Sequence, residues 1–130
     1  MFSIKMSEED LKNLRSSAKG KLTRVINKLT PLLESKGQAA LESEKQISDL
    51  GKDLETAVTN FNSCHEAYRQ ASKKAAATKD LEKVEIENEN YLEEVKKNVY
   101  NIDTLAKKYK ATLDAEKNIP DAKINLDRSR

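Results

Sequence analysis

The sequence predicts an all-α protein built from three long amphipathic helices, folded as an antiparallel helical bundle or as a coiled-coil hairpin. Its apolar residues recur every three or four positions, which is the spacing of one face of an α-helix. Its composition is 35% charged and 37% hydrophobic, with three glycines and two prolines, and this suits long helices that each bury one stripe. A length of 130 residues fits a single domain.

The first helix is expected to begin at Ser7, because its hydroxyl can cap the helix and three acidic residues follow it. Pro31 cannot donate a backbone hydrogen bond and Gly37 lacks a restraining side chain, so this helix should kink or stop between positions 30 and 37. The apolar seam of the first helix consists of Leu11, Leu14, Ala18, Leu22, Val25 and Leu29.

Two further seams repeat the same period. Their mean step of about 3.5 residues is the coiled-coil value, so other helices are the expected packing partners. The second seam consists of Ile47, Leu50, Leu54, Val58, Phe61, His65 and Tyr68. The third seam consists of Leu92, Val95, Val99, Ile102, Ala106 and Tyr109.

The connection between the second and third seams allows two predictions. Residues 71–77 are good helix formers without glycine or proline, which favours one continuous rod. Thr78, Lys79 and Asp80 are the best candidates for a turn, and Asp80 can cap a new helix. The turn would give a hairpin.

The chain is expected to divide into a helical domain and two unstructured ends. We predict a disordered N-terminus at 1–6 and a helical bundle or coiled-coil domain at 7–117. Residues 118–130 contain Pro120 and show no sustained period, so we expect a flexible tail there.

The sequence does not predict an enzyme. Cys64 and His65 are the only pair of soft metal ligands, whereas zinc requires about four, and adjacent helix positions point about 100° apart. We therefore expect no catalytic residue, metal, cofactor or small-molecule substrate. His65 would sense pH if it were buried, because the unperturbed pKa of histidine lies near physiological pH.

The charges are nearly balanced, since basic residues exceed acidic ones by 24 − 22 = +2. Positions 1–30 are more basic, with seven basic and three acidic residues. These basic residues flank both edges of the first seam. Their position favours a packing role, in which the apolar stems of the lysine and arginine side chains cover the buried seam. The alternative is non-specific contact with nucleic-acid phosphates. The possible phosphate contacts are Lys19, Lys21, Arg24 and Lys28.

The expected location is the cytoplasm. A single cysteine cannot close an internal disulfide, and the apolar runs are too short for a signal peptide or a membrane span. We therefore predict an intracellular protein that does not bind membranes.

Three stretches suggest a family. They are AKGKLTRV at 18–25, FNSCHEAY at 61–68 and YLEEV at 91–95. In this order they resemble the helical N-terminal Gag-type region of BEL/Pao long-terminal-repeat retrotransposon polyproteins. The resemblance implies a domain that precedes a capsid-like region and helps Gag chains associate, with packing roles for Phe61, His65 and Tyr68.

The expected function is therefore structural self-association through helix packing, with a homodimer favoured and other Gag-like chains as possible partners. Two alternatives stay open: a nucleic-acid-binding module that uses the basic first helix, or a generic cytosolic helical adaptor.

Overall fold

The computed structural model describes residues 7–77 and 79–128, with side chains described as far as residue 118. Every regular element in these ranges is an α-helix. Three helices are long, as the sequence predicts, and the all-α bundle is confirmed. The helices are α1 (Glu8–Leu33), the short α2 (Gln38–Glu42), α3 (Glu44–Ala75) and α4 (Leu81–Arg128).

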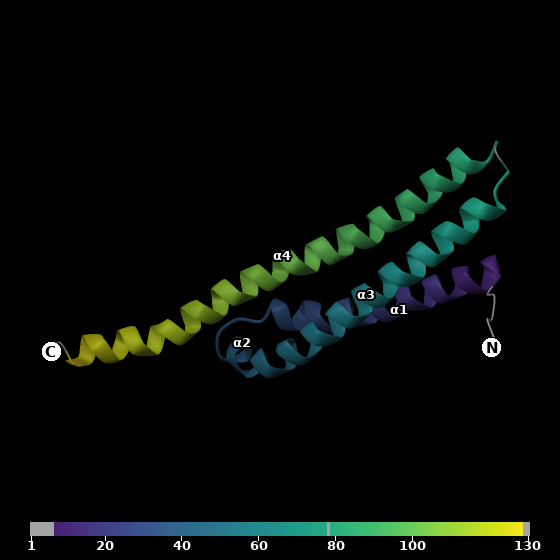
Figure 1. The fold of residues 1–130 in the computed structure, drawn as a ribbon. Helices are drawn as coiled ribbons and strands as arrows, with labels where there is room; N and C mark the ends of the chain where they lie inside the picture. The colour runs from purple at the N-terminus through teal and green to yellow at the C-terminus, as the bar shows by residue number, and fades with distance from the viewer. Residues whose placement is uncertain (1–6, 78, 129–130) are drawn as a thin grey trace.

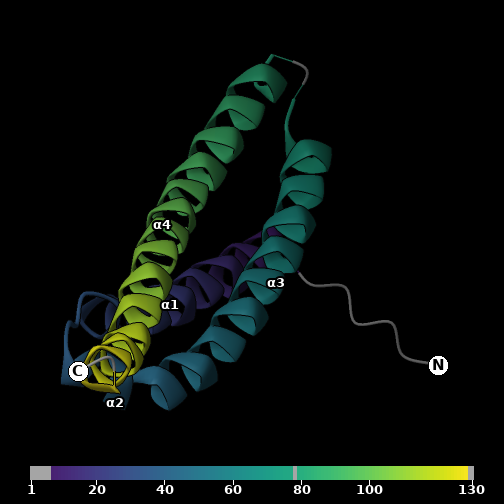
Figure 2. The same ribbon diagram turned by 90° about the vertical axis from the view of Figure 1, so that its left-hand side faces the viewer.

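The long helices lie antiparallel in chain order, so that α1 and α4 run in the same direction (Figure 1). Helices α1 and α3 pack closely against each other, whereas α4 approaches both of them less closely. Figure 2 shows α4 and α3 diverging on one side of the bundle, with α1 between them.

Ser7 caps α1 as predicted. Its side chain accepts a hydrogen bond from the backbone N–H of Asp10 at 3.1 Å, and the Asp10 carboxylate accepts from the Ser7 N–H at 3.3 Å. This capping box satisfies two of the free donors of the first turn. The helix ends at Leu33, two residues after Pro31, and Gly37 leads into α2 with a φ of 62°. The predicted end between positions 30 and 37 is confirmed.

A turn separates α3 from α4, so the hairpin alternative holds and the continuous rod does not. Helix α3 ends at Ala75, and Ala76 is extended with a ψ of 137°. The backbone N–H of Asp80 donates to the Ala77 carbonyl at 2.9 Å, and α4 begins at the next residue.

Helix α4 has helical backbone to Arg128, which corrects the helix end predicted at residue 117. No glycine follows Gly51, and Pro120 lies inside this helix, where it removes one backbone donor. The flexibility predicted for 118–130 stays a prediction. The predicted disordered segment 1–6 lies outside the described residues, as do the last two positions of the chain.

The buried apolar side chains form two clusters along the bundle. One cluster joins α1 and α2 to the middle of α4, and the other joins α1, α3 and the first half of α4. The first contains Leu29, Leu33, Ala40, Ile102, Tyr109 and Leu113. The second contains Ala18, Leu22, Phe61 and Val95.

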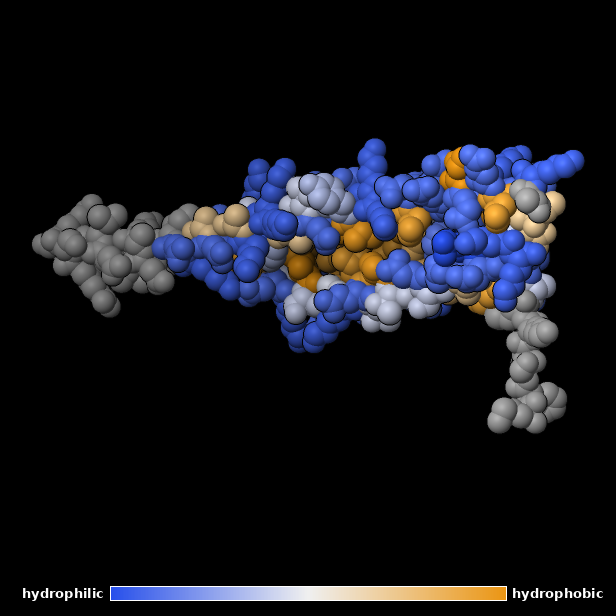
Figure 3. Space-filling model, turned by 45° about the horizontal axis from the view of Figure 1, so that its top comes forward, coloured by the Kyte–Doolittle hydropathy of each residue, from blue (hydrophilic) through white to orange (hydrophobic). Residues whose placement is uncertain are grey.

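One side of the bundle leaves apolar surface uncovered. An apolar strip runs between the polar outer surfaces of α3 and α4 (Figure 3). Apolar side chains of both helices pack against the second cluster while remaining only half-buried, among them Leu54, Val58, Leu92 and Val99. The strip follows from the divergence of α3 and α4.

Candidate functional site

Four polar side chains are buried near the turn end of the bundle, where an apolar core would be expected. They come from all three long helices, and none is more than 6% exposed. We call them the polar layer: Arg15 of α1, His65 and Ser72 of α3, and Asn88 of α4. Polar groups with so little contact with water need hydrogen-bond partners within the protein.

Arg15 lies between two tyrosine rings. Its Cζ atom is 4.1 Å from the ring centroid of Tyr68 and 3.8 Å from that of Tyr91. The negative faces of the rings stabilise the positive charge. None of the ion pairs among the described residues includes Arg15. Burial lowers the pKa of its guanidinium, but an arginine stays charged at neutral pH.

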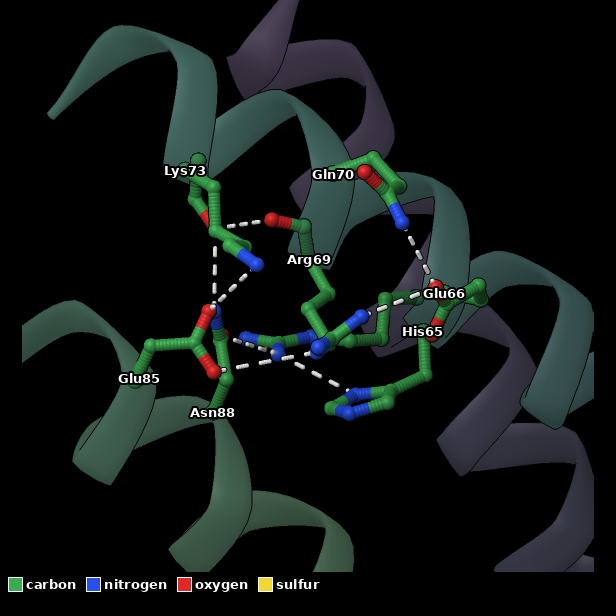
Figure 4. A network of polar contacts seen from close by, with 9 residues as sticks. His65, Glu66, Arg69, Gln70, Lys73, Glu85 and Asn88 are labelled. Atoms are coloured by element: carbon green, nitrogen blue, oxygen red, sulfur yellow. Dashed lines mark hydrogen bonds and ion pairs between the residues drawn. The ribbon is translucent and has the colours of Figure 1, made fainter. Parts of the chain in front are cut away.

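Hydrogen bonds connect the polar layer across the three helices. Arg15 Nη1 donates to Asn88 Oδ1 at 3.2 Å, and Asn88 Nδ2 donates to Ser72 Oγ at 2.9 Å. Ser72 Oγ in turn donates to the Arg69 carbonyl at 3.0 Å (Figure 4). Only Nε of the Arg15 guanidinium is buried without a partner. The network therefore fixes the positions of α1, α3 and α4 relative to one another along the bundle axis.

His65 completes the layer as a neutral ring. Its Nδ1 atom lies 3.4 Å from Arg15 Nη1 (Figure 4). Since a guanidinium can only donate, Nδ1 is the acceptor, and we assign the ring proton to Nε2. Burial is the main cause that lowers the pKa of His65, and the charge of Arg15 is the next. The ring also stacks on Phe61, with centroids 5.8 Å apart.

Charged side chains at the rim of the layer pair with each other. Glu85 lies 3.4 Å from Lys73 and 3.8 Å from Arg69, and Glu66 accepts hydrogen bonds from Arg69 and Gln70 at 2.9 Å each (Figure 4). Glu85 Oε1 makes no well-directed hydrogen bond, so its approach to Lys73 is a charge contact only. These part-exposed pairs stabilise the fold little.

The predicted seam residues fall into three groups by burial. Those that the structure buries are Ala18, Leu22, Leu29, Phe61, His65, Val95, Ile102 and Tyr109. Those that it half-buries are Leu11, Val25, Ile47, Leu50, Leu54, Val58, Tyr68, Leu92 and Val99. Those that it exposes are Leu14 and Ala106.

The two exposed residues are corrections to the predicted seams. Leu14 is 41% exposed, because the inward line of α1 passes through Arg15 and Ala18, and Leu14 points about 100° away from Arg15. In α4, Leu105 packs against the first cluster in place of Ala106.

The polar layer contains residues that the seam prediction missed. Arg15 and Ser72 are not among the predicted packing residues, because the predicted seams contain only apolar side chains and the aromatic or imidazole rings. Asn88 roughly extends the predicted third seam upstream but is not one of its residues. A signal was present. Steps of three and four lead from His65 through Tyr68 to Ser72, and one heptad leads back from Val95 to Asn88. The period placed these positions inside although their chemistry is polar.

The four candidate phosphate contacts do not form one surface. Lys19 Nζ lies 3.3 Å from Glu94 Oε1, so its charge is paired between α1 and α4. Lys21, Arg24 and Lys28 are exposed and follow at steps of three and four, so they share one edge of α1.

The chemistry available in the polar layer is limited to hydrogen bonding and a change of charge. His65 Nδ1 is engaged with Arg15, and the Cys64 thiol points to Asn60 Oδ1 at 3.9 Å, so the two neighbours do not form a nucleophile and base pair. Within the described residues, no group of three or more His, Cys, Asp and Glu side chains could hold a metal ion.

Comparisons with protein-family models, curated proteins and solved structures found no match to this chain. In the part of the chain that the structure describes, no helix is both long enough and apolar enough to cross a bilayer.

Proposed function

We propose that this chain is an intracellular helical self-association domain, which docks a second copy of itself through helix packing. The Gag-type resemblance implies the same role. The observation that supports the proposal best is the apolar strip between α3 and α4.

The strip has the character of an incomplete helix bundle. Side chains such as Leu54, Val58, Leu92 and Val99 pack inward but keep part of their surface in water. An added helix would cover them, and burial of apolar surface contributes about 25 cal/mol per Å². Four-helix bundles bury their seams in this way.

The charge of the chain favours a second copy as the occupant. A net charge of only +2 produces little repulsion between copies. Acidic and basic residues are also interspersed around the bundle, as the pair Lys19–Glu94 shows, so the rims of two strips can form ion pairs. A partner with strong net charge of one sign would gain no such complementarity.

The double variant Val58→Lys with Val99→Lys tests the strip. Both side chains are half-buried, so the long lysine stems can reach water while their charges disfavour a docked helix. We expect the variant to keep its helical circular dichroism and its dimer dissociation constant to rise at least tenfold, as measured by sedimentation equilibrium.

The matched control is Tyr100→Ser, which removes a side chain that is 71% exposed on α4. It should leave association unchanged. Loss of association in this control, or full association of the lysine variant, would contradict docking at the strip. If the lysine variant unfolds, the nearly isosteric pair Val58→Thr with Val99→Thr takes its place.

A second candidate function, contact with nucleic-acid phosphates, is favoured by the exposed edge that Lys21, Arg24 and Lys28 share. It predicts that RNA or DNA binds at about 50 mM salt and is released as salt rises, because counterion release drives such binding. A triple change of these residues to glutamine should abolish the mobility shift. Absence of any shift by the unchanged chain removes this candidate.

A further inference from the structure

We propose that the polar layer is an acid-sensitive switch, in which protonation of His65 separates α1 from α3 and α4 near the turn end of the bundle. The switch lies within one chain and goes beyond self-association, on which it does not depend.

The geometry around His65 requires a neutral ring. Nδ1 accepts from Arg15 Nη1 at 3.4 Å, and this contact joins α1 to α3. A proton on Nδ1 replaces the acceptor with a donor, so two N–H groups would face each other. The two side chains would also carry like charges at sites that are 6% and 4% exposed. The contact that holds α1 would become repulsive.

Charged groups face His65 from all three long helices. They are Arg15 of α1, Glu66 and Arg69 of α3, and Glu85, Glu89 and Lys96 of α4. The cations disfavour a charged imidazole, and Glu66 is the carboxylate that favours it. Both Glu66 and Glu85 already contact Arg69, and Glu89 is exposed to solvent. The surroundings therefore do not neutralise a second buried cation.

The elements that would move follow from the network. Arg15 also donates to Asn88, and Asn88 donates to Ser72, so displacement of the guanidinium releases the tie between α1 and α4 as well. Ala18 lies one turn further along α1 and belongs to the second apolar cluster. Acid would consequently expose apolar surface that the neutral bundle covers.

The pH range follows from the direction of the pKa shift. His65 has a lower pKa in the folded chain than its ordinary value of 6.5, so the unfolded chain takes up the proton first. Stability from this site is complete above the unfolded pKa and is lost as pH falls toward the folded pKa. The Glu66 pairs are lost only below the ordinary glutamate value of 4.5, because hydrogen bonding to Gln70 and Arg69 lowers the pKa of Glu66.

A nuclear magnetic resonance titration tests the proposal directly, because the chain has one histidine and its ring signals need no further assignment. We expect the folded chain to show Nε2–H as the neutral tautomer and to protonate at lower pH than the chain in urea. Each unit by which the pKa of His65 in the folded chain lies below its pKa in urea should raise the unfolding equilibrium constant tenfold as pH falls from the upper to the lower of these values.

His65→Asn provides the matched variant, since its amide oxygen can accept from Arg15 but does not titrate. Melting temperatures at about pH 7.5 and about pH 5.5 should differ for the unchanged chain and agree for this variant. Glu66→Gln is the control that should keep the difference. A His65 that protonates at or above the urea value overturns the switch, and so does an unchanged pH dependence in His65→Asn.

If His65→Asn does not fold, Arg15→Met replaces it, and the protonation midpoint of His65 should then rise toward the urea value. No rise would overturn the role of Arg15. Repeating the measurements at low and high protein concentration distinguishes this switch from self-association, because an event within one chain does not depend on concentration.

Discussion

Arg15 stands at a position where the seam period places a side chain inside the bundle, and it is charged. Two tyrosine faces and the acceptors on Asn88 and His65 replace the water that a guanidinium loses on burial. Each of these groups would be poorly placed without the others. A network of this kind is stabilising only while it is complete.

Asn88→Ala should therefore lower the free energy of unfolding by about 1–3 kcal/mol, because it leaves donors or acceptors on Arg15 and Ser72 unpaired in the core. Urea denaturation followed by circular dichroism measures this. Asn90→Ala, at an exposed position of the same helix, is the control and should change little. Equal effects in the two variants would rule out the network as the cause.

Arg15→Lys should lower the free energy of unfolding by about 2 kcal/mol, since an ammonium cannot stack as a plane between two rings. The conservative change Arg24→Lys on the exposed edge of α1 should be nearly neutral. Equal stability of the Arg15 variant and the unchanged chain would contradict the sandwich.

The buried arginine is the part of the site that the sequence could not predict. The periodicity locates the inward faces, but it predicts Leu14 in the seam and places the basic residues at the seam's edges, because apolar side chains are normally buried. Burial of an arginine depends on two tyrosines from other helices. That combination is visible only once α1, α3 and α4 are packed together.

At the scale of elements, local signals predicted where helices begin and end. Ser7 with Asp10 predicted the start of α1, and Pro31 with Gly37 predicted its end, because each acts through its own backbone. The short helix α2 and the full length of α4 were not predicted. Residues 118–128 lack an apolar period and contain Pro120, which together predict no helix, yet their backbone is helical.

Two glycines give a matched test of the element boundaries. Gly37 has a φ of 62° and a ψ of −139°, so Gly37→Ala should lower the free energy of unfolding by about 1–3 kcal/mol through strain alone, because no atom lies within 4 Å of an added Cβ. Gly51 lies inside α3 with equally open space, and Gly51→Ala should instead raise it by about 0.5–1 kcal/mol. Thermal melting shows whether each variant is less or more stable than the unchanged chain. A change of stability in the same direction for both variants would contradict the helix boundary assigned at Gly37.

At the scale of the whole molecule, the bundle is asymmetric because α4 packs less closely than α1 and α3 pack with each other. The sequence could not predict this, since all three seams share a similar period and any pair could have been the closest. The half-buried strip between α3 and α4 is the consequence on which the proposed self-association rests (Figure 3). It leaves a place for one more helix.

Self-association through the α3–α4 strip is tested most directly by sedimentation equilibrium of the unchanged chain. One chain has a mass of 14.7 kDa, so a dimer has 2 × 14.7 = 29.4 kDa. We expect the weight-average mass to rise from the first value toward the second as protein concentration increases into the high micromolar range. A mass that stays at 14.7 kDa throughout would contradict self-association through the α3–α4 strip.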